Sequence, residues 1–187
     1  CMSFIFASVI GIPCGIFAAV KRGKGIDTVV MVLSIVGVSA PAFWVAIILQ
    51  ILFGLKLNVL PISGFDTPAS YILPSLALGA RYAGNIARIT RTSMLEVLGQ
   101  DYIRTARAKG VPGWKVIFKH ALRNALIPVI TYVGPMVAYI LTGSMVVENI
   151  FTIGGLGSSF VTSITNRDYT MIMATTIFLA VLMVIAN

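Results

Sequence analysis

The chain has 187 residues, of which 58% are hydrophobic and only 11% are charged. Soluble domains average roughly 45–50% apolar and about 25% charged residues, so a soluble domain of this size could not bury so much apolar surface. The composition excludes a secreted disulfide scaffold, a disordered chain and a conventional soluble enzyme, and it predicts that lipid solvates much of the chain. The net charge is +8, which in a membrane protein is typical of cytoplasmic loops rather than of nucleic-acid binding.

Two apolar segments come first in the chain. Residues 2–20 carry no charge and are long enough to cross about 30 Å of hydrocarbon. A basic turn, with Lys21, Arg22 and Lys24, ends this run. Residues 28–54 form a second span in which Pro41 predicts a kink, and a turn-rich loop covers residues 55–70.

Three further spans are predicted downstream. The third runs from about residue 71 to 89, the fourth covers about 125–147, and the fifth runs from about residue 169 to the end. A polar stretch, residues 88–123, lies between the third and fourth, and a loop over residues 148–168 precedes the fifth. The predicted fold is an all-α integral membrane protein with about five transmembrane helices.

Glycine and proline interrupt these spans. The positions are Pro41, Gly79, Pro128, Gly134-Pro135 and Gly143. Membrane helices tolerate such residues where neighbouring protein or water satisfies the backbone. Two interpretations stay open for each position, namely a helix that bends or lines a pathway, and close packing of helices through small residues.

Positive charges are distributed unevenly between the two sides of the membrane. The turn at residues 21–24 and the polar stretch at 88–123 carry eleven Lys and Arg residues and face the same side, because two spans separate them. The other side receives only Lys56 and Arg167. This bias predicts that the basic side is cytoplasmic and that the chain enters from outside, crosses five times and ends inside.

The two ends of the sequence indicate a fragment. The chain starts at Cys1 without an initiator Met and stops directly behind an apolar run. We therefore expect residues 1–187 to form one transmembrane domain that is truncated at its N-terminus and also at its C-terminus.

The polar stretch contains the most informative segment. Asp101 is suited to cap a short helix, Gly110 fits the left-handed position that follows it, and Pro112 prevents its continuation. This helix is about ten residues, or ~15 Å, long and is too polar to enter the bilayer. Held between two rigid elements, it has the shape of a docking element for another protein.

A second helix is predicted from about Pro112. Trp114, Ile117, Phe118 and Ala121 recur on one face, so we expect an amphipathic helix at the membrane surface before the fourth span. Its basic residues are Lys115, Lys119 and Arg123. Attraction to anionic lipid head groups is an alternative explanation for these three charges.

A run of ten residues, 101–110, and a second run, 120–128, resemble the cytoplasmic signature loop of ABC importer permeases. Residues 88–96, the outer segment 148–157 and residues 60–64 fit the dipeptide, oligopeptide and nickel class of this family. Arg104 stands where the general importer pattern has Glu, and residues 120–123 read His-Ala-Leu-Arg; both departures are similar to the peptide class. Gly154 stands where that class has Pro, which makes this turn less rigid.

The resemblance implies a fragment of a six-helix type I ABC importer permease with a cytoplasmic coupling loop over residues 88–124. It implies a transport subunit without enzymatic activity, and the sequence has no phosphate-binding loop pattern of its own. No cofactor is expected in this chain, since ATP and magnesium would be bound by two partner ATP-binding subunits. Further implied partners are a second permease subunit of a different chain, an extracytoplasmic solute-binding protein and the lipid bilayer, without nucleic acid.

The same resemblance implies multi-pass residence in a bacterial or archaeal cytoplasmic membrane. The implied substrates are dipeptides or oligopeptides, with nickel, glutathione or another small solute as alternatives. The segment 101–110 would act as the coupling helix that receives motion from the ATPase. Its candidate coupling residues are Asp101, Tyr102, Arg104, Thr105, Ala106, Arg107, Ala108, Lys109 and Gly110.

Four other charged residues are candidate site residues. Arg81 lies near the middle of the third span, where a charge is costly and usually faces a cavity or the protein interior. It is a candidate to line the translocation pathway and meet a substrate carboxylate, with snorkelling or structural pairing as alternatives. Asp66, Glu148 and Asp168 lie in the outer loops and are candidates to contact the solute-binding protein, although solvated loop charge explains them equally well.

Other functional classes find little support in the sequence. His120 is the only histidine, and Cys1 and Cys14 are interpreted as packing residues, so no metal site is predicted. An intramembrane protease would need a nucleophile and a base within the spans, and no G-x-S-x-G pattern is present. A self-sufficient channel or an ion-driven carrier stays open as a distant alternative, although Arg81 alone offers no proton or sodium relay.

Overall fold

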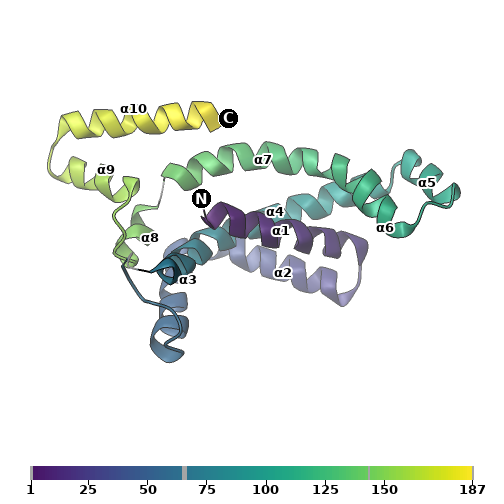
Figure 1. The fold of residues 1–187 in the computed structure, drawn as a ribbon, viewed down its shortest axis with the longest axis horizontal. Coiled ribbons are helices and arrows are strands. Elements are labelled where there is room, and N and C mark those ends of the chain that lie inside the picture. The colour runs from purple at the N-terminus through teal and green to yellow at the C-terminus, as the bar shows by residue number, and fades with distance from the viewer. Residues whose placement is uncertain (1, 65–66, 143, 187) are drawn as a thin grey trace.

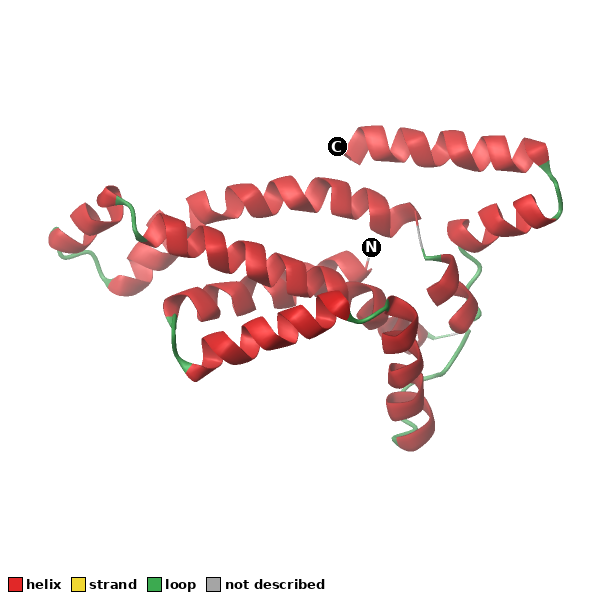
Figure 2. Cartoon of the chain, turned by 180° about the vertical axis from the view of Figure 1, so that it is seen from behind, coloured by secondary structure: helices red, strands yellow, loops and turns green. Residues whose placement is uncertain are grey.

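The computed structural model describes residues 2–64, 67–142 and 144–186. Over these ranges the chain is helical and contains no strand (Figure 1, Figure 2), which confirms the predicted fold class. The elements in chain order are α1 (Met2–Val20), α2 (Gly25–Ser39), α3 (Ala42–Leu49), the π-helical segment η1 (Gln50–Lys56), the 3-10 turn η2 (Pro68–Tyr71), α4 (Ile72–Leu98), α5 (Asp101–Ala108), α6 (Gly113–Lys115), the π-helical segment η3 (Val116–Ala121), α7 (Leu122–Thr142), α8 (Met145–Ile150), α9 (Leu156–Thr165) and α10 (Tyr169–Ala186).

The central element of the bundle is α4, which packs against α1, α2, α3 and α7. At one end of the bundle lie α5 and α6, while α8 and α9 lie at the other (Figure 1). The predicted third span ended near residue 89, but α4 continues as helix to Leu98. Part of the predicted cytoplasmic loop at 88–124 is therefore a rigid extension of a bundle helix.

Small residues bring α1 directly onto α4. They recur every four positions on α1 and all are buried: Ser3, Ala7, Gly11, Gly15 and Ala19. Residues four apart lie on one helix face, so this stripe is flat and lets the two backbones approach closely. A Cβ atom at Gly15 would lie 2.6 Å from the carbonyl oxygen of Ala87 on α4. Gly79 likewise faces Phe6, since a Cβ there would lie 2.8 Å from its ring, which favours the packing interpretation at that position.

The second predicted span is broken rather than kinked. The chain bends by 106° between the helices Gly25–Ser39 and Ala42–Lys56. Proline disfavours a helical conformation in the residue before it, and Ala40 is accordingly extended, with φ −70° and ψ 127°. Pro41 marked the place of the bend, but the prediction of a mere kink is wrong.

The predicted break at Gly134-Pro135 is also wrong, because α7 runs unbroken through Pro128 and Pro135. Proline removes one N–H from a helix, and the remaining backbone bonds hold an apolar helix together in lipid. Gly143, another predicted interruption, lies outside the described residues.

The helix predicted from Pro112 is not a separate surface element. It begins at Gly113 with Pro112 as its N-cap and continues into α7 as one helix over Gly113–Ile140. Trp114 and Phe118, on the predicted apolar face, are 63% and 58% exposed, whereas Val116 is 1% exposed. A face directed toward lipid would be exposed in this way, and the π-helical segment η3 changes the spacing of the faces relative to an α-helix.

Among the described residues, two helices are long and apolar enough to cross a membrane by length and composition, namely α1 and Gly113–Ile140. The number is three if the bent pair of α2 and Ala42–Lys56 counts as one span. The sequence predicted about five crossings. Of the other two predicted spans, α4 has 27 residues but carries charges along its length, and the apolar helix Tyr169–Ile185 is shorter.

The two ends of the bundle have separate cores. At the basic end, which holds the turn at residues 21–24 and helix α5, Ile16, Met94, Ile103 and Val116 share one buried cluster. The opposite end has its own cluster, made by Ala46, Leu73, Ala77, Val147 and Phe151. The two segments that carry most of the positive charge therefore lie at the same end, as predicted, whereas their cytoplasmic location stays a prediction.

We expect Gly15→Ala to destabilise the bundle, because the added Cβ would meet the α4 backbone and Thr90. Overpacking of this kind costs about 1–3 kcal/mol. Thermal unfolding of the purified permease in detergent measures the effect. Gly113→Ala is the matched control, since a Cβ there meets nothing within 4 Å, and equal melting temperatures for the two variants would contradict the packing described here.

Candidate functional site

Helix α5 is attached to the bundle by one buried side chain. Ile103 is 0% exposed and packs in the cluster that holds Met94 of α4, Val116 of η3 and Ile16 of α1. Ala106 is half-buried beside it. The other side chains of the helix are exposed, namely Asp101, Tyr102, Arg104, Thr105, Arg107 and Ala108.

The C-terminal end of α5 confirms the prediction for Gly110. Its φ is +75°, in the left-handed region that glycine adopts without a Cβ penalty. The Gly110 N–H donates to the carbonyl of Arg107 at 3.0 Å, and the Val111 N–H donates to that of Ala106 at 3.2 Å. This pair of bonds is the Schellman arrangement, which satisfies carbonyls that a helix end leaves free.

The N-terminal end of α5 differs from the prediction that Asp101 caps it. The N-cap is Gln100, whose side chain makes no capping bond, and Asp101 is the first helical residue. A carboxylate in the first turn still interacts favourably with the helix dipole. Its contact with Arg104 is weak, because the two groups are 3.4 Å apart and 74% and 95% of the Arg104 and Asp101 side chains are exposed.

The exposed face of α5 is basic and is held at a fixed orientation. Arg107 forms no ion pair within the described part of the chain, and Lys109 lies exposed beside it. The Asn124 side chain donates a hydrogen bond of 2.8 Å to the Tyr102 hydroxyl, which ties α5 to α7 as well as to the Ile103 cluster. Arg104, Arg107 and Lys109 therefore form an exposed basic face on an element of fixed orientation.

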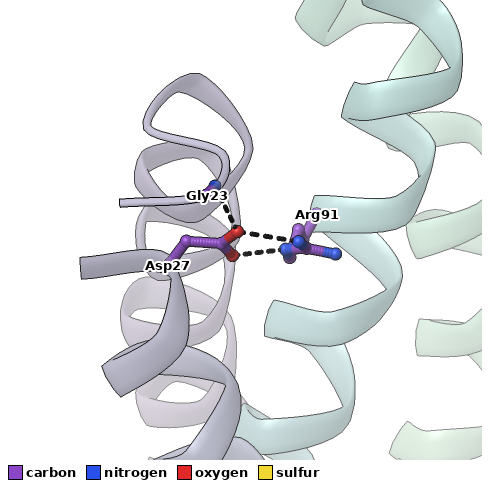
Figure 3. A network of polar contacts seen from close by, with 3 residues as sticks. All are labelled: Gly23, Asp27 and Arg91. Atoms are coloured by element: carbon purple, nitrogen blue, oxygen red, sulfur yellow. Dashed lines mark hydrogen bonds and ion pairs between the residues drawn. The ribbon is translucent and has the colours of Figure 1, made fainter. Parts of the chain in front are cut away.

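An ion pair next to this helix was not found from the sequence. Arg91 of α4 donates to Asp27 of α2 through Nε, at 2.5 Å, and through Nη2, at 2.8 Å. The Gly23 N–H donates to the same carboxylate at 3.0 Å (Figure 3). The two bonds from Arg91 make the pair bidentate. Asp27 is 5% exposed, so its carboxylate is largely screened from water.

The pair fixes the α1–α2 turn against α4 at the basic end. A signal for it was present, because Asp27 is one of only six acidic residues and follows directly on the basic turn at residues 21–24. Sequence reasoning used the charges of that turn for orientation and grouped Arg91 with the loop, without asking which acid it would meet.

A groove between α4 and α7 contains Arg81. Its cavity volume is about 630 Å³. From α4 it is lined by Arg81, Tyr82 and Asn85. From α7 it is lined by Pro128, Thr131, Tyr132, Pro135, Met136 and Tyr139, whose spacing is that of one helix face.

The groove contains polar side chains at a depth where a membrane helix is usually apolar. Arg81 lies about 14 Å along α4 from its start at Ile72 and forms no ion pair across residues 2–64, 67–142 and 144–186. The Asn85 amide donates to the Tyr132 hydroxyl at 3.0 Å. The structure thus places Arg81 on a cavity, which the pathway interpretation of this residue requires, whereas snorkelling and structural pairing were the alternatives.

The outer candidate residues have different surroundings. Asp66 lies outside the described residues. Glu148 is 8% exposed, and its carboxylate accepts a hydrogen bond of 2.7 Å from the Ser158 N–H in the first turn of α9, so it has a role within the chain. Asp168 is exposed and accepts from the Met171 N–H at 3.0 Å, which caps α10.

Glycines allow this arrangement of Glu148. A Cβ atom at Gly155 would lie 2.3 Å from the Glu148 carboxyl carbon. The outer loop at residues 148–168 contains the short helix α9. In the described ranges no group of three or more His, Cys, Asp or Glu residues is placed to hold a metal ion.

The family model for the binding-protein-dependent transport system inner membrane component matches residues 11–187. The chain belongs to this family. It is 47% identical over 183 residues to the dipeptide transport system permease protein DppB of Bacillus subtilis, which covers 98% of the chain and 59% of that protein. It is 44% identical to the oligopeptide transport system permease protein OppB of Salmonella typhimurium, over 96% of the chain and 60% of OppB.

A third relative widens the range of solutes. The glutathione transport system permease protein GsiC of Salmonella choleraesuis is 45% identical over 99% of the chain and 60% of its own length. The chain thus spans about three fifths of the length of these curated relatives. Family membership confirms the resemblance to the peptide class of importer permeases.

Reversing the two charges of the Asp27–Arg91 pair should restore what single substitutions lose. We expect Asp27→Asn and Arg91→Gln each to lower the melting temperature of the purified permease, because Arg91→Gln leaves the buried Asp27 carboxylate without its counter-charge and Asp27→Asn does the same to the half-buried Arg91. The double variant Asp27→Arg/Arg91→Asp should recover part of the loss. A double variant that melts no higher than either single variant would contradict an ion pair between the two side chains.

Proposed function

We propose that this chain is part of the permease subunit of an ATP-binding-cassette importer, and that it forms the translocation pathway for peptides across the bacterial cytoplasmic membrane. The observation that carries this proposal is α5, a short basic helix that is exposed on one face and held against the bundle by Ile103 on the other. The family membership supports the same conclusion.

The energy for transport comes from two separate ATP-binding subunits, which bind ATP and magnesium. On this proposal, α5 sits in a groove of one of them, with Arg104 and Arg107 against acidic groups. Motion of that subunit passes through Ile103 into the cluster shared by α1, α4 and η3. Because α4 continues without interruption from this cluster to the groove at Arg81, the motion reaches the pathway as a rigid displacement.

The pathway is completed by a second permease subunit, which we propose to be a different chain. The groove between α4 and α7 is open on one side, where Arg81, Thr131 and Tyr139 are exposed. A second subunit facing this side would close the groove into a conduit. An extracytoplasmic solute-binding protein would deliver the solute at the opposite end of the bundle, where Asp168 is exposed and Glu148 fixes the start of α9.

Peptides are the substrate class that the similar proteins support best. The relatives are named for dipeptide, oligopeptide and glutathione transport, and glutathione is itself a tripeptide. The alternative of nickel is less well supported, because the described lining of the groove has a guanidinium and no His or Cys, whereas transition metals prefer imidazole and thiolate ligands.

We expect Arg107→Glu to uncouple ATP hydrolysis from uptake. Placing a like charge opposite an acidic surface costs several kcal/mol, so peptide uptake by the reconstituted importer should fall roughly tenfold or more. Lys21→Glu is the matched control, since it reverses an exposed charge at the same end outside α5. Equal uptake by both variants would contradict the role assigned to α5.

A further inference from the structure

We propose that the groove between α4 and α7 is a binding site for the C-terminal carboxylate and backbone of the transported peptide, with Arg81 as the carboxylate ligand. The inference rests on the proposed function and adds the chemistry of recognition inside the membrane. The groove would then select among solutes, in addition to any selection made by the solute-binding protein.

Arg81 supplies the charge. A guanidinium is ionised at any physiological pH and presents a planar fork of N–H donors that matches a carboxylate in bidentate geometry. Its only neighbours in the groove lining are neutral residues. The net charge of the described lining is therefore +1, which complements a single carboxylate and repels a metal cation.

The neutral groups suit a peptide backbone, which offers one N–H donor and one carbonyl acceptor per residue. The Tyr132 hydroxyl accepts from Asn85 and so keeps its own proton to donate. The Asn85 amide keeps its carbonyl oxygen as an acceptor. The Tyr139 hydroxyl, at the same groove, adds both a donor and an acceptor.

Pro135 adds a backbone acceptor to the same face. A proline has no N–H for the carbonyl four residues earlier, which here belongs to Thr131. The Thr131 hydroxyl donates its proton to the Ile127 carbonyl at 3.1 Å, so its oxygen is left as an acceptor. Peptide N–H groups thus find acceptors along α7, while the carboxylate finds its donor on α4.

The dimensions agree with short peptides. The volume of about 630 Å³ lies within the range of small-molecule sites, roughly 300–1,000 Å³. From Pro128 to Tyr139 the groove extends about 16 Å along α7, the length of roughly four or five extended residues. A dipeptide, a tripeptide or a short oligopeptide fits this length.

Uptake by the whole importer in proteoliposomes tests the inference. A tripeptide with a free carboxyl group is compared with its C-terminal amide, each delivered on saturating binding protein, for the wild type, Arg81→Gln and Arg81→Lys. We expect Arg81→Gln to lower uptake of the free acid roughly tenfold or more while amide uptake changes little, and Arg81→Lys to recover part of the loss. Arg88→Gln, an exposed arginine of α4 outside the groove, is the matched control and should change neither.

A second measurement avoids the binding protein. In a background without reactive cysteines, Thr131→Cys should be protected from a thiol reagent by the free tripeptide and not by its amide, and the protection should disappear with Arg81→Gln. Equal effects on acid and amide would overturn the inference. Loss of the second permease from the purified Arg81→Gln complex would also overturn it, since Arg81 would then pair with an acid of that subunit. A wild-type complex without ATP-dependent peptide uptake would instead contradict the proposed function.

Discussion

The burial of Ile103 is the interaction on which the coupling account depends. A helix of eight residues is too short to be stable alone in water, so α5 takes its order from what it packs against. Ile103 places it on a cluster built from α1, α4 and η3, and Gly110 ends it in a fixed turn. The exposed surface of α5 can then contact a partner protein while Ile103 stays packed against the bundle.

The rigidity of the basic end follows from contacts that leave little room for adjustment. The stripe of small residues on α1 puts its backbone against α4, and the Asp27–Arg91 pair closes the α1–α2 turn onto the same helix. These contacts make α1, the start of α2, α4 and α5 one body. Because α4 also lines the groove with Arg81, the proposed coupling would carry a displacement at α5 to the groove without a flexible joint in between.

Much of this arrangement follows from local sequence. The apolar run of α1, the left-handed Gly110, the stop before Pro112 and the bend at Pro41 each depend on a few neighbouring residues, and the structure has each in place. The Asp101 cap was wrong because Gln100 occupies the N-cap position and Asp101 is the first helical residue. The break at Gly134-Pro135 was wrong because α7 continues through both of its prolines.

The candidate site was also predictable only in part, because some of its contacts join residues that are far apart in the sequence. The residues of α5 could be named from their pattern, and Arg81 from its depth. The Asp27–Arg91 pair and the groove partners Asn85, Tyr132 and Tyr139 are joined by long-range packing, which a sequence without aligned relatives does not reveal. Glu148 was interpreted as a charge that faces outward, although its carboxylate accepts a hydrogen bond from the first turn of α9.

The most direct test is to measure the distance between two spin labels in the whole importer. One label is attached at Ala108→Cys on α5 and the other at Lys24→Cys in the α1–α2 turn, and both positions are exposed. The distance distribution should be the same in the nucleotide-free and the ATP-bound states, while a label on α9 moves relative to both. A distance between α5 and the turn that changes with nucleotide would contradict the rigid basic end, and with it the transmission of ATPase motion to the groove.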